Sequence, residues 1–190
     1  MFIEQACRRQ IIEAAVTTVA RMGFRNASLG AIAHMSAISK GVNPYQFSGK
    51  EELMEACVDR VYASIAERAI SQLEQLTPLE FVREHILAVA RDDLAHREDL
   101  VAGTEIVTHL RRKDGRRRYS MADNEGLYRT LEQKYEAVSA MRVFDHRVMA
   151  VTVQSALDSM FGYWITFPEH DLIAHTEQLA NLVVAAIRVP

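Results

Sequence analysis

The sequence predicts an all-α protein of about nine helices, arranged as a small N-terminal domain of three helices followed by a helical bundle. Apolar residues recur at the three- and four-residue spacing of a helix along nearly the whole chain, and no segment alternates as a β-strand does. Serine, threonine and aspartate stand before these apolar runs, where they can cap helices. Hydrophobic residues make up 49% of the 190 residues, which is enough for a packed core.

Two helices are expected before residue 36. The apolar stripe over residues 11–22 predicts the first, and Gly23 is expected to end it because glycine readily adopts a left-handed conformation. Ser28 is expected to cap the second helix, which is short and carries its apolar residues on one face.

The third helix and the end of the small domain follow directly. After a tight connection, Ser39 can cap a third short helix. Residues 48–51 match the capping box S-x-x-E and predict a long helix to about residue 75. We therefore expect residues 1–48 to form one domain and residues 49–190 to form the other.

Further capping signals divide the second domain. Thr77–Glu80 is another capping box, and its Pro78 stands at the first helical position, where the missing N–H costs nothing. Asp145 can cap a later helix. With the apolar spacing, these signals predict helices over about residues 78–97, 99–112, 123–141, 145–166 and 171–188.

Charge is unevenly distributed along the chain. Residues 1–50 hold six Lys or Arg against two Asp or Glu, whereas residues 51–190 hold 16 against 23. A basic N-terminal part (the front) followed by an acidic remainder (the body) suggests that the front binds a polyanion. Chance asymmetry in a helical protein is the simpler alternative.

Three short helices with a tight turn between the second and third match the geometry of a helix-turn-helix. A duplex would be bound through phosphates by lysines, hydroxyls and a helix N-terminus, and read through its bases by amides and small apolar groups. A glycine would allow close approach of the backbone. The candidate DNA-binding residues are Ser28, Ser39, Lys40, Gly41, Val42, Asn43, Tyr45, Gln46 and Lys50.

Residues 8–56 resemble the N-terminal domain of the TetR (tetracycline repressor-like) family. The run "IIEAAVTTVARMGFRNASLGAIAHMSAISKGVNPYQFSGKEELMEA" carries an amphipathic first helix, a G-[FY] after it, a capped second helix, and then S-K-G, Y-x-F and K-E-E-L. The resemblance implies a DNA-binding front, an effector-binding body, a homodimer and, most often, a repressor.

The chain departs from the family at two neighbouring positions, where the family usually has an apolar residue and an aromatic. Here they are Asn43 and Pro44. Proline cannot donate a backbone hydrogen bond and disfavours helical dihedrals in the residue before it. Either the helix from Ser39 continues as a kinked or 3₁₀ turn, or Asn43 caps a new helix with Pro44 at its first position. Both would re-aim the base-reading side chains.

The last two helices favour a homodimer. Residues 148–165 carry a single charged side chain, Asp158, and the final helix is apolar at helical spacing. Two such helices from each subunit would form a two-fold, four-helix interface. A dimer also suits DNA, because two heads on a two-fold axis call for a pseudo-palindromic site. The alternative is a core helix inside a monomer.

A small-molecule pocket is indicated more weakly. Bulky aromatic and a few polar residues on the body helices could line an apolar cavity, although core filling is the simpler role for any one of them. A buried carboxylate at Asp158 would need a partner: a cationic ligand, Arg91 or a residue across the dimer interface. The candidate ligand-binding residues are Arg91, His109, Tyr128, Tyr135, Gln154, Asp158, Phe161 and Trp164.

The segment "RRKDGRRRYS" at residues 111–120 is strongly basic within an acidic body. A solvated, mobile loop is the simplest interpretation. An anionic effector site and a second DNA contact are the alternatives.

No pattern of an enzyme, metal site or cofactor site is present. The histidines lack metal-binding spacing, and no G-x-S-x-G or phosphate loop occurs. Cys7 and Cys57 indicate a reducing compartment, no signal peptide is visible, and no stretch is apolar enough to span a membrane, so we expect a cytoplasmic protein.

The sequence therefore favours a TetR-like transcriptional regulator, as a repressor that a small molecule releases from a pseudo-palindromic operator by binding the body. The alternative is a helical ligand-binding or protein-interaction dimer that has lost specific DNA reading, for which Asn43 and Pro44 are the main support.

Overall fold

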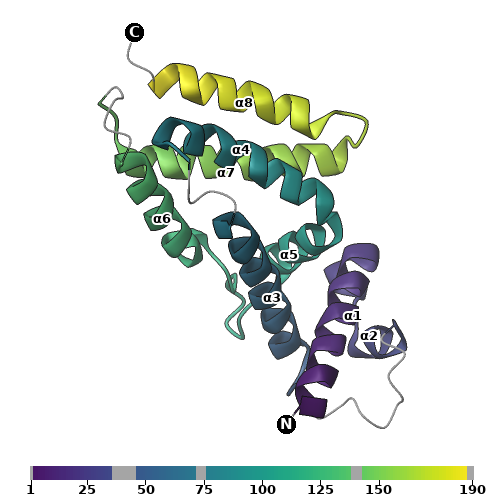
Figure 1. Ribbon diagram of the computed structural model, residues 1–190. Coiled ribbons are helices and arrows are strands. Elements are labelled where there is room, and N and C mark those ends of the chain that lie inside the picture. The colour runs from purple at the N-terminus through teal and green to yellow at the C-terminus, as the bar shows by residue number, and fades with distance from the viewer. Residues whose placement is uncertain (1, 36–45, 72–75, 138–142, 188–190) are drawn as a thin grey trace. The chain divides into compact units, whose positions relative to one another are not determined.

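The computed structural model describes residues 2–35, 46–71, 76–137 and 143–187, and these residues are helical throughout apart from their connections (Figure 1). The all-α prediction is confirmed. The helix expected from Ser39 lies outside the described residues. The elements are α1 (Phe2–Asn26), α2 (Leu29–Met35), α3 (Lys50–Ser71), α4 (Pro78–Ala95), α5 (Arg97–His109), the 3₁₀ turn η1 (Met121–Asn124), α6 (Glu125–Glu136), α7 (His146–Thr166) and α8 (Leu172–Ile187).

The chain forms two compact units. The first comprises residues 1–66 and 96–120, and the second comprises residues 67–95 and 121–190. The first unit therefore holds most of α3, all of α5 and the basic segment after α5, in addition to α1 and α2. That residues 1–48 bind DNA remains a prediction, because the division into compact units does not test function.

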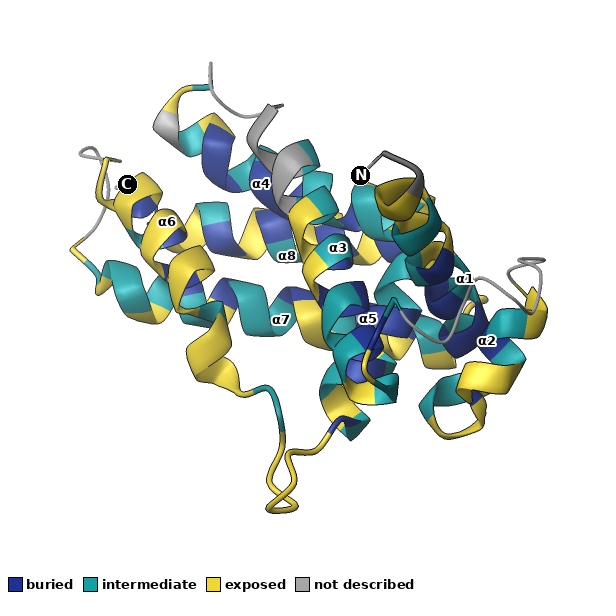
Figure 2. Ribbon diagram, turned by 90° about the horizontal axis from the view of Figure 1, so that it is seen from below, coloured by how far each residue is buried: buried dark blue, intermediate teal, exposed yellow. Residues whose placement is uncertain are grey.

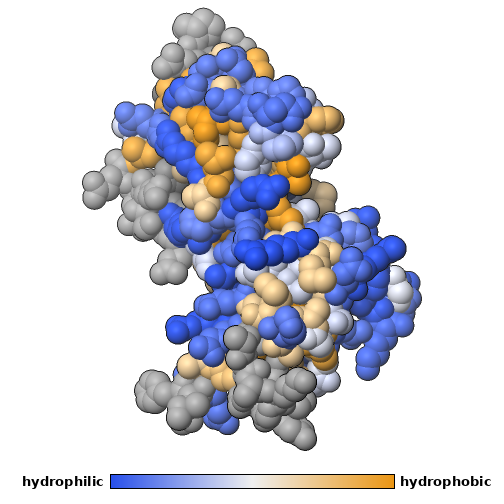
Figure 3. Space-filling model, turned by 90° about the vertical axis from the view of Figure 1, so that its right-hand side faces the viewer, coloured by the Kyte–Doolittle hydropathy of each residue, from blue (hydrophilic) through white to orange (hydrophobic). Residues whose placement is uncertain are grey.

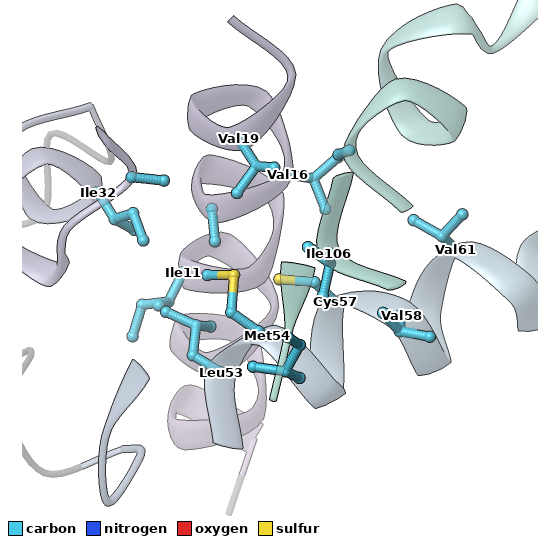
Figure 4. Packing of buried hydrophobic residues seen from close by; sticks show 14 of the residues in the cluster. Ile11, Val16, Val19, Ile32, Leu53, Met54, Cys57, Val58, Val61 and Ile106 are labelled. Carbon is cyan, nitrogen blue, oxygen red and sulfur yellow. The ribbon is translucent and has the colours of Figure 1, made fainter. Parts of the chain in front are cut away.

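The core of the first unit joins α1, α2, α3 and α5. Ile11 and Val19 of α1 face Ile32 of α2, Met54 of α3 and Ile106 of α5 in Figure 4, and all five side chains are almost completely buried. Burying apolar side chains of this size stabilises the fold by roughly 1.5–3 kcal/mol each. The shared core therefore fixes the positions of α2 and of the start of α3 relative to each other.

The chain changes direction at Gly23, as predicted. Its φ of 76° is strained for residues with a Cβ, and the helix nevertheless resumes beyond it and ends at Asn26. The backbone N–H of Phe24 donates to the Glu105 carboxylate at 3.1 Å, and the Phe24 carbonyl accepts from Lys50 Nζ at 2.6 Å. Side chains of α5 and α3 thus hold the turn that leads into α2.

The second unit is built from α4, α6, α7 and α8, with α4 packed on α8 and α6 packed on α7. Its core includes Val82, Ile86, Tyr135, Val153 and Ile187, which are all nearly inaccessible to solvent. None of the helices in the described part of the chain is both long and apolar enough to cross a bilayer.

The helix-capping predictions hold with one shift. Asp145 accepts from the Val148 N–H at 2.8 Å, and the Glu80 carboxylate accepts from the Thr77 N–H at 3.0 Å. At the start of α3, however, the Ser48 N–H donates to Glu52 and not to Glu51, because α3 begins at Lys50 and places Glu52 toward the segment of chain that enters it.

Candidate functional site

Three of the nine predicted DNA-binding residues can be located: Ser28, Gln46 and Lys50. The other six lie outside the described residues, together with Pro44, and their roles stay predictions: Ser39, Lys40, Gly41, Val42, Asn43 and Tyr45. The described residues nevertheless show how the segment between α2 and α3 is held at its two ends.

Ser28 begins α2. Its hydroxyl accepts from the Ala31 N–H at 3.2 Å, and its carbonyl accepts from the Ile32 N–H at 3.0 Å. This is the geometry of an N-cap, so the predicted cap is confirmed. Ser28 is exposed, whereas Ile32 is buried in the shared core, so one side of α2 is anchored and the start of the helix faces solvent.

Lys50 has a structural role that its sequence position did not suggest. Its ammonium donates to the Phe24 carbonyl at 2.6 Å and lies 4.4 Å from the centre of the Phe24 ring. Burial lowers the pKa of this ammonium from its ordinary value. Lys50 ties the first residue of α3 to the end of α1, and its contact with a phosphate remains a prediction.

Arg8 also holds the C-terminal end of the segment between α2 and α3, close to Lys50 in the sequence. Its guanidinium donates to the Gln46 carbonyl at 2.6 Å, lies 3.9 Å from the centre of the Phe47 ring and donates to Glu52 at 3.3 Å. The hydrogen bonds from Ser48 and Arg8 lower the pKa of the Glu52 carboxyl. Gln46 is thus placed through its backbone, which leaves its side-chain amide without a role in this clamp.

The eight predicted ligand-binding residues fall in both units. His109 belongs to the first, where its Nδ1 lies 2.9 Å from the Glu105 carbonyl and its ring stacks on Phe24 at 6.0 Å between centroids. The remaining seven lie in the second unit. Of these, the four aromatic residues are core residues that are at most 9% exposed: Tyr128, Tyr135, Phe161 and Trp164.

The polar members of the set do not converge. Arg91 is exposed and pairs with Glu84 at 3.2 Å, so it is not the partner of Asp158. Asp158 is exposed in the single chain, contrary to the expectation of a buried carboxylate, and accepts from the Gln154 amide at 2.8 Å. Partial burial among neighbouring side chains raises the pKa of its carboxyl.

Two buried polar atoms in the second unit lack a hydrogen-bond partner among the described residues: His85 Nε2 and the Tyr135 hydroxyl. His85 stacks in parallel on Phe81 with 5.7 Å between ring centroids, and burial lowers the pKa of its imidazole to about 4, so the ring is neutral. Burial raises the pKa of the Tyr135 phenol. Buried polar atoms are normally paired, so both atoms are candidates to bind a ligand.

The comparisons with known proteins agree with this geometry. No family model matches the chain. The chain is 24% identical to a probable HTH-type transcriptional regulator, ArpR of Pseudomonas putida. The alignment covers 97% of this chain and 93% of ArpR. A shorter alignment at 29% identity covers 43% of this chain and 40% of HTH-type transcriptional regulator BetI 1 of Chromohalobacter salexigens.

Solved structures give the same result over the whole chain. A protein concerned with the control of antibiotic production by bacterial hormones matches with a TM-score of 0.79 and 25% identity, covering 97% of this chain and 98% of the other. A tetR-family regulatory protein from Rhodococcus RHA1 matches in fold with a TM-score of 0.77 at 15% identity, covering 96% and 97%. NalD, the secondary repressor of the MexAB-OprM efflux pump in Pseudomonas aeruginosa, matches with a TM-score of 0.73 at 17% identity, covering 99% and 98%.

The chain has the fold of TetR-family regulators and is similar over nearly its whole length to an HTH-type transcriptional regulator.

Two residues that hold the predicted DNA-binding segment were not recognised from the sequence, Arg8 and Glu105. Arg8 acts on residues 38 and 44 positions away, and Glu105 acts on a backbone 81 positions away. Their charge alone gave no signal, because pairing across such separations depends on the packing of α1 on α3 and α5. His85 was missed for a different reason, since a lone histidine in an apolar helix face resembles an ordinary core residue.

Proposed function

We propose that this TetR-like regulator represses transcription by binding a pseudo-palindromic DNA site as a homodimer, and that a small molecule bound in the second unit releases it. Such a regulator works in the cytoplasm. The observation that carries the proposal is that α1, α2 and the start of α3 share one core. The segment between α2 and α3 is thereby held at both ends, by the buried Ile32 and by the clamp of Arg8 on Gln46.

A gel-shift titration with the DNA upstream of the protein's own gene tests the proposal. Phosphate contacts release counterions, so binding should weaken steeply as salt is added, and an unlabelled upstream fragment should compete better than unrelated DNA. Binding that is absent, or that does not respond to salt, would favour the alternative of a helical ligand-binding dimer that has lost DNA reading.

Exposed apolar residues on the last two helices support the homodimer. Leu182 of α8 is 69% exposed, Val148 of α7 is 60% exposed, and Tyr163 and Phe167 at the end of α7 are also exposed. Figure 3 shows apolar side chains reaching the surface among polar ones on one face of the molecule. Since α4 and α6 already cover the inner faces of α7 and α8, a second copy is the natural cover for their outer faces.

The unpaired atoms of His85 and Tyr135 support the site of the effector. Both are buried in the second unit, where the neighbouring side chains are apolar. A neutral imidazole and a phenol can each donate or accept one hydrogen bond, so they suit an uncharged, mainly apolar molecule with one or two polar groups. A compound that releases the DNA should also raise the melting temperature of the protein.

A further inference from the structure

Six basic residues lie on an ordered hairpin after α5: Arg111, Arg112, Lys113, Arg116, Arg117 and Arg118. The hairpin is closed by a β-bridge between Arg111 and Arg117 and by hydrogen bonds between backbone atoms on its two sides, from Arg112 to Arg116 at 2.8 Å and from Arg118 to Leu110 at 3.0 Å. Gly115 turns the chain with a φ of 82°, which favours glycine. The predicted loop therefore contains a hydrogen-bonded hairpin.

The base of this hairpin is attached to the DNA-binding unit. Arg118 donates to Glu55 of α3 at 2.6 Å, and Tyr119 packs against the core of the first unit. A groove of about 420 Å³ separates the hairpin from α3 and is lined by Glu51, Glu55, Leu110, Arg111, Arg112 and Arg118. The three arginines that line the groove thus share it with two carboxylates of α3. These carboxylates would repel a small anion, so the groove is a poor site for one.

The outer basic residues face fewer carboxylates than the arginines that line the groove. Lys113, Arg116 and Arg117 are exposed and do not line the groove, and the loop between α5 and α6 projects as an exposed segment in Figure 2. The carboxylate of Asp114 lies 3.9 Å from the Arg116 side chain and also accepts from the Arg116 N–H at 3.0 Å. Three basic side chains and one carboxylate therefore share the exposed turn, which leaves the turn with a net positive charge.

We propose that this hairpin is a second DNA contact of the first unit, in which Lys113, Arg116 and Arg117 bind phosphates of the duplex that α2 and the start of α3 hold. The inference rests on the proposed DNA-binding function. A duplex is favoured over a small anionic effector because the three charges stand on a convex turn, where a row of phosphates can reach them and an enclosed ligand cannot. The hairpin and α3 also belong to one compact unit, so the hairpin keeps its place beside α3.

The test compares the wild type with the triple variant Lys113→Gln, Arg116→Gln, Arg117→Gln. Fluorescence anisotropy measures binding to the labelled upstream fragment and to an unrelated duplex of equal length over a series of salt concentrations. The slope of log K against log salt should become shallower by about 0.9 for each phosphate that the variant no longer binds, on both duplexes. The preference for the upstream fragment should stay unchanged, because binding to phosphates carries no sequence information.

A matched variant removes the same charge from the second unit: Arg83→Gln, Arg129→Gln, Lys134→Gln. It should keep the wild-type slope, and melting curves should show that both variants fold. A wild-type slope in the hairpin variant, or an equal change in both variants, would overturn the hairpin contact while the proposed function stands. If the wild type binds neither duplex, the proposed function fails first and the hairpin contact fails with it.

Discussion

Single charged side chains hold the first unit together by bonding to backbone atoms far away in the sequence. Lys50 donates to the carbonyl of Phe24, and Glu105 accepts from the N–H of the same residue. Arg8 donates to the carbonyl of Gln46. Hydrogen bonds to charged groups contribute about 1.5–3 kcal/mol when partly shielded. These bonds determine where α2 starts and where the chain enters α3, so they link single residues to the placement of the interface.

The Tyr135 hydroxyl gives a prediction at the same scale. Tyr135→Phe removes a buried polar atom that has no partner among the described residues, so it should raise the free energy of unfolding by about 1 kcal/mol. For a chain of this length, that corresponds to a melting temperature higher by about 2–4 °C. Calorimetry of the ligand-free protein measures it, and a loss of stability would mean that the hydroxyl is paired.

A second residue prediction concerns Asp93 of α4. Burial and the neighbouring carboxylates of Asp92 and Asp158 raise the pKa of the Asp93 carboxyl to about 7, from 3.8. The folded protein therefore binds a proton that the unfolded chain releases between about pH 4 and pH 7. Stability from this group is greatest at low pH and is lost as the pH rises to about 7.

Asp93→Asn should remove this loss. After allowance for the part of the side chain that water reaches, we expect the variant to gain about 1 kcal/mol more stability at pH 8 than at pH 5. Urea unfolding at the two pH values measures the difference. An equal effect at both would show that Asp93 titrates normally.

At the scale of helices, the sequence predicted the elements whose signals are local. The caps at Ser28 and Asp145 and the turn at Gly23 depend on residues within four positions, and all three are confirmed. At α3 the sequence pattern predicted a bond from Ser48 to Glu51, whereas Glu52, one residue further on, accepts it, because α3 begins at Lys50. The basic hairpin was not predicted, and its ion pair with α3 joins Arg118 to Glu55, 63 positions away.

Loss of a cap should affect function only in the first unit. Ser28→Ala and Asp145→Ala each remove one N-cap hydrogen bond and should each cost about 1 kcal/mol of stability. Ser28→Ala should in addition weaken binding to the upstream fragment, because the proposed function places the start of α2 at the DNA. Thermal melts and gel shifts of the two variants separate these effects, and equal DNA binding by both would remove Ser28 from the interface.

The whole molecule requires a second copy if the outer faces of α7 and α8 are to be covered. Leu182→Glu places a charge on the most exposed apolar position of α8 and should shift the dimer toward monomer. Leu94→Glu is the control, because Leu94 of α4 is an exposed leucine, at 48%, that lies on neither helix. Light scattering during size exclusion gives the masses. A monomeric wild type, or a dimeric Leu182→Glu, would place the interface elsewhere or remove it.

The most direct test of a two-headed DNA-binding protein is a footprint on the DNA upstream of its gene. We predict protection of two half-sites related by a two-fold axis, with their centres about one helical turn or a multiple of it apart. Leu182→Glu should lose both half-sites together at concentrations where the wild type protects them. Absence of protection, or a single unpaired protected segment that the variant retains, would contradict a regulator that holds its operator with two heads.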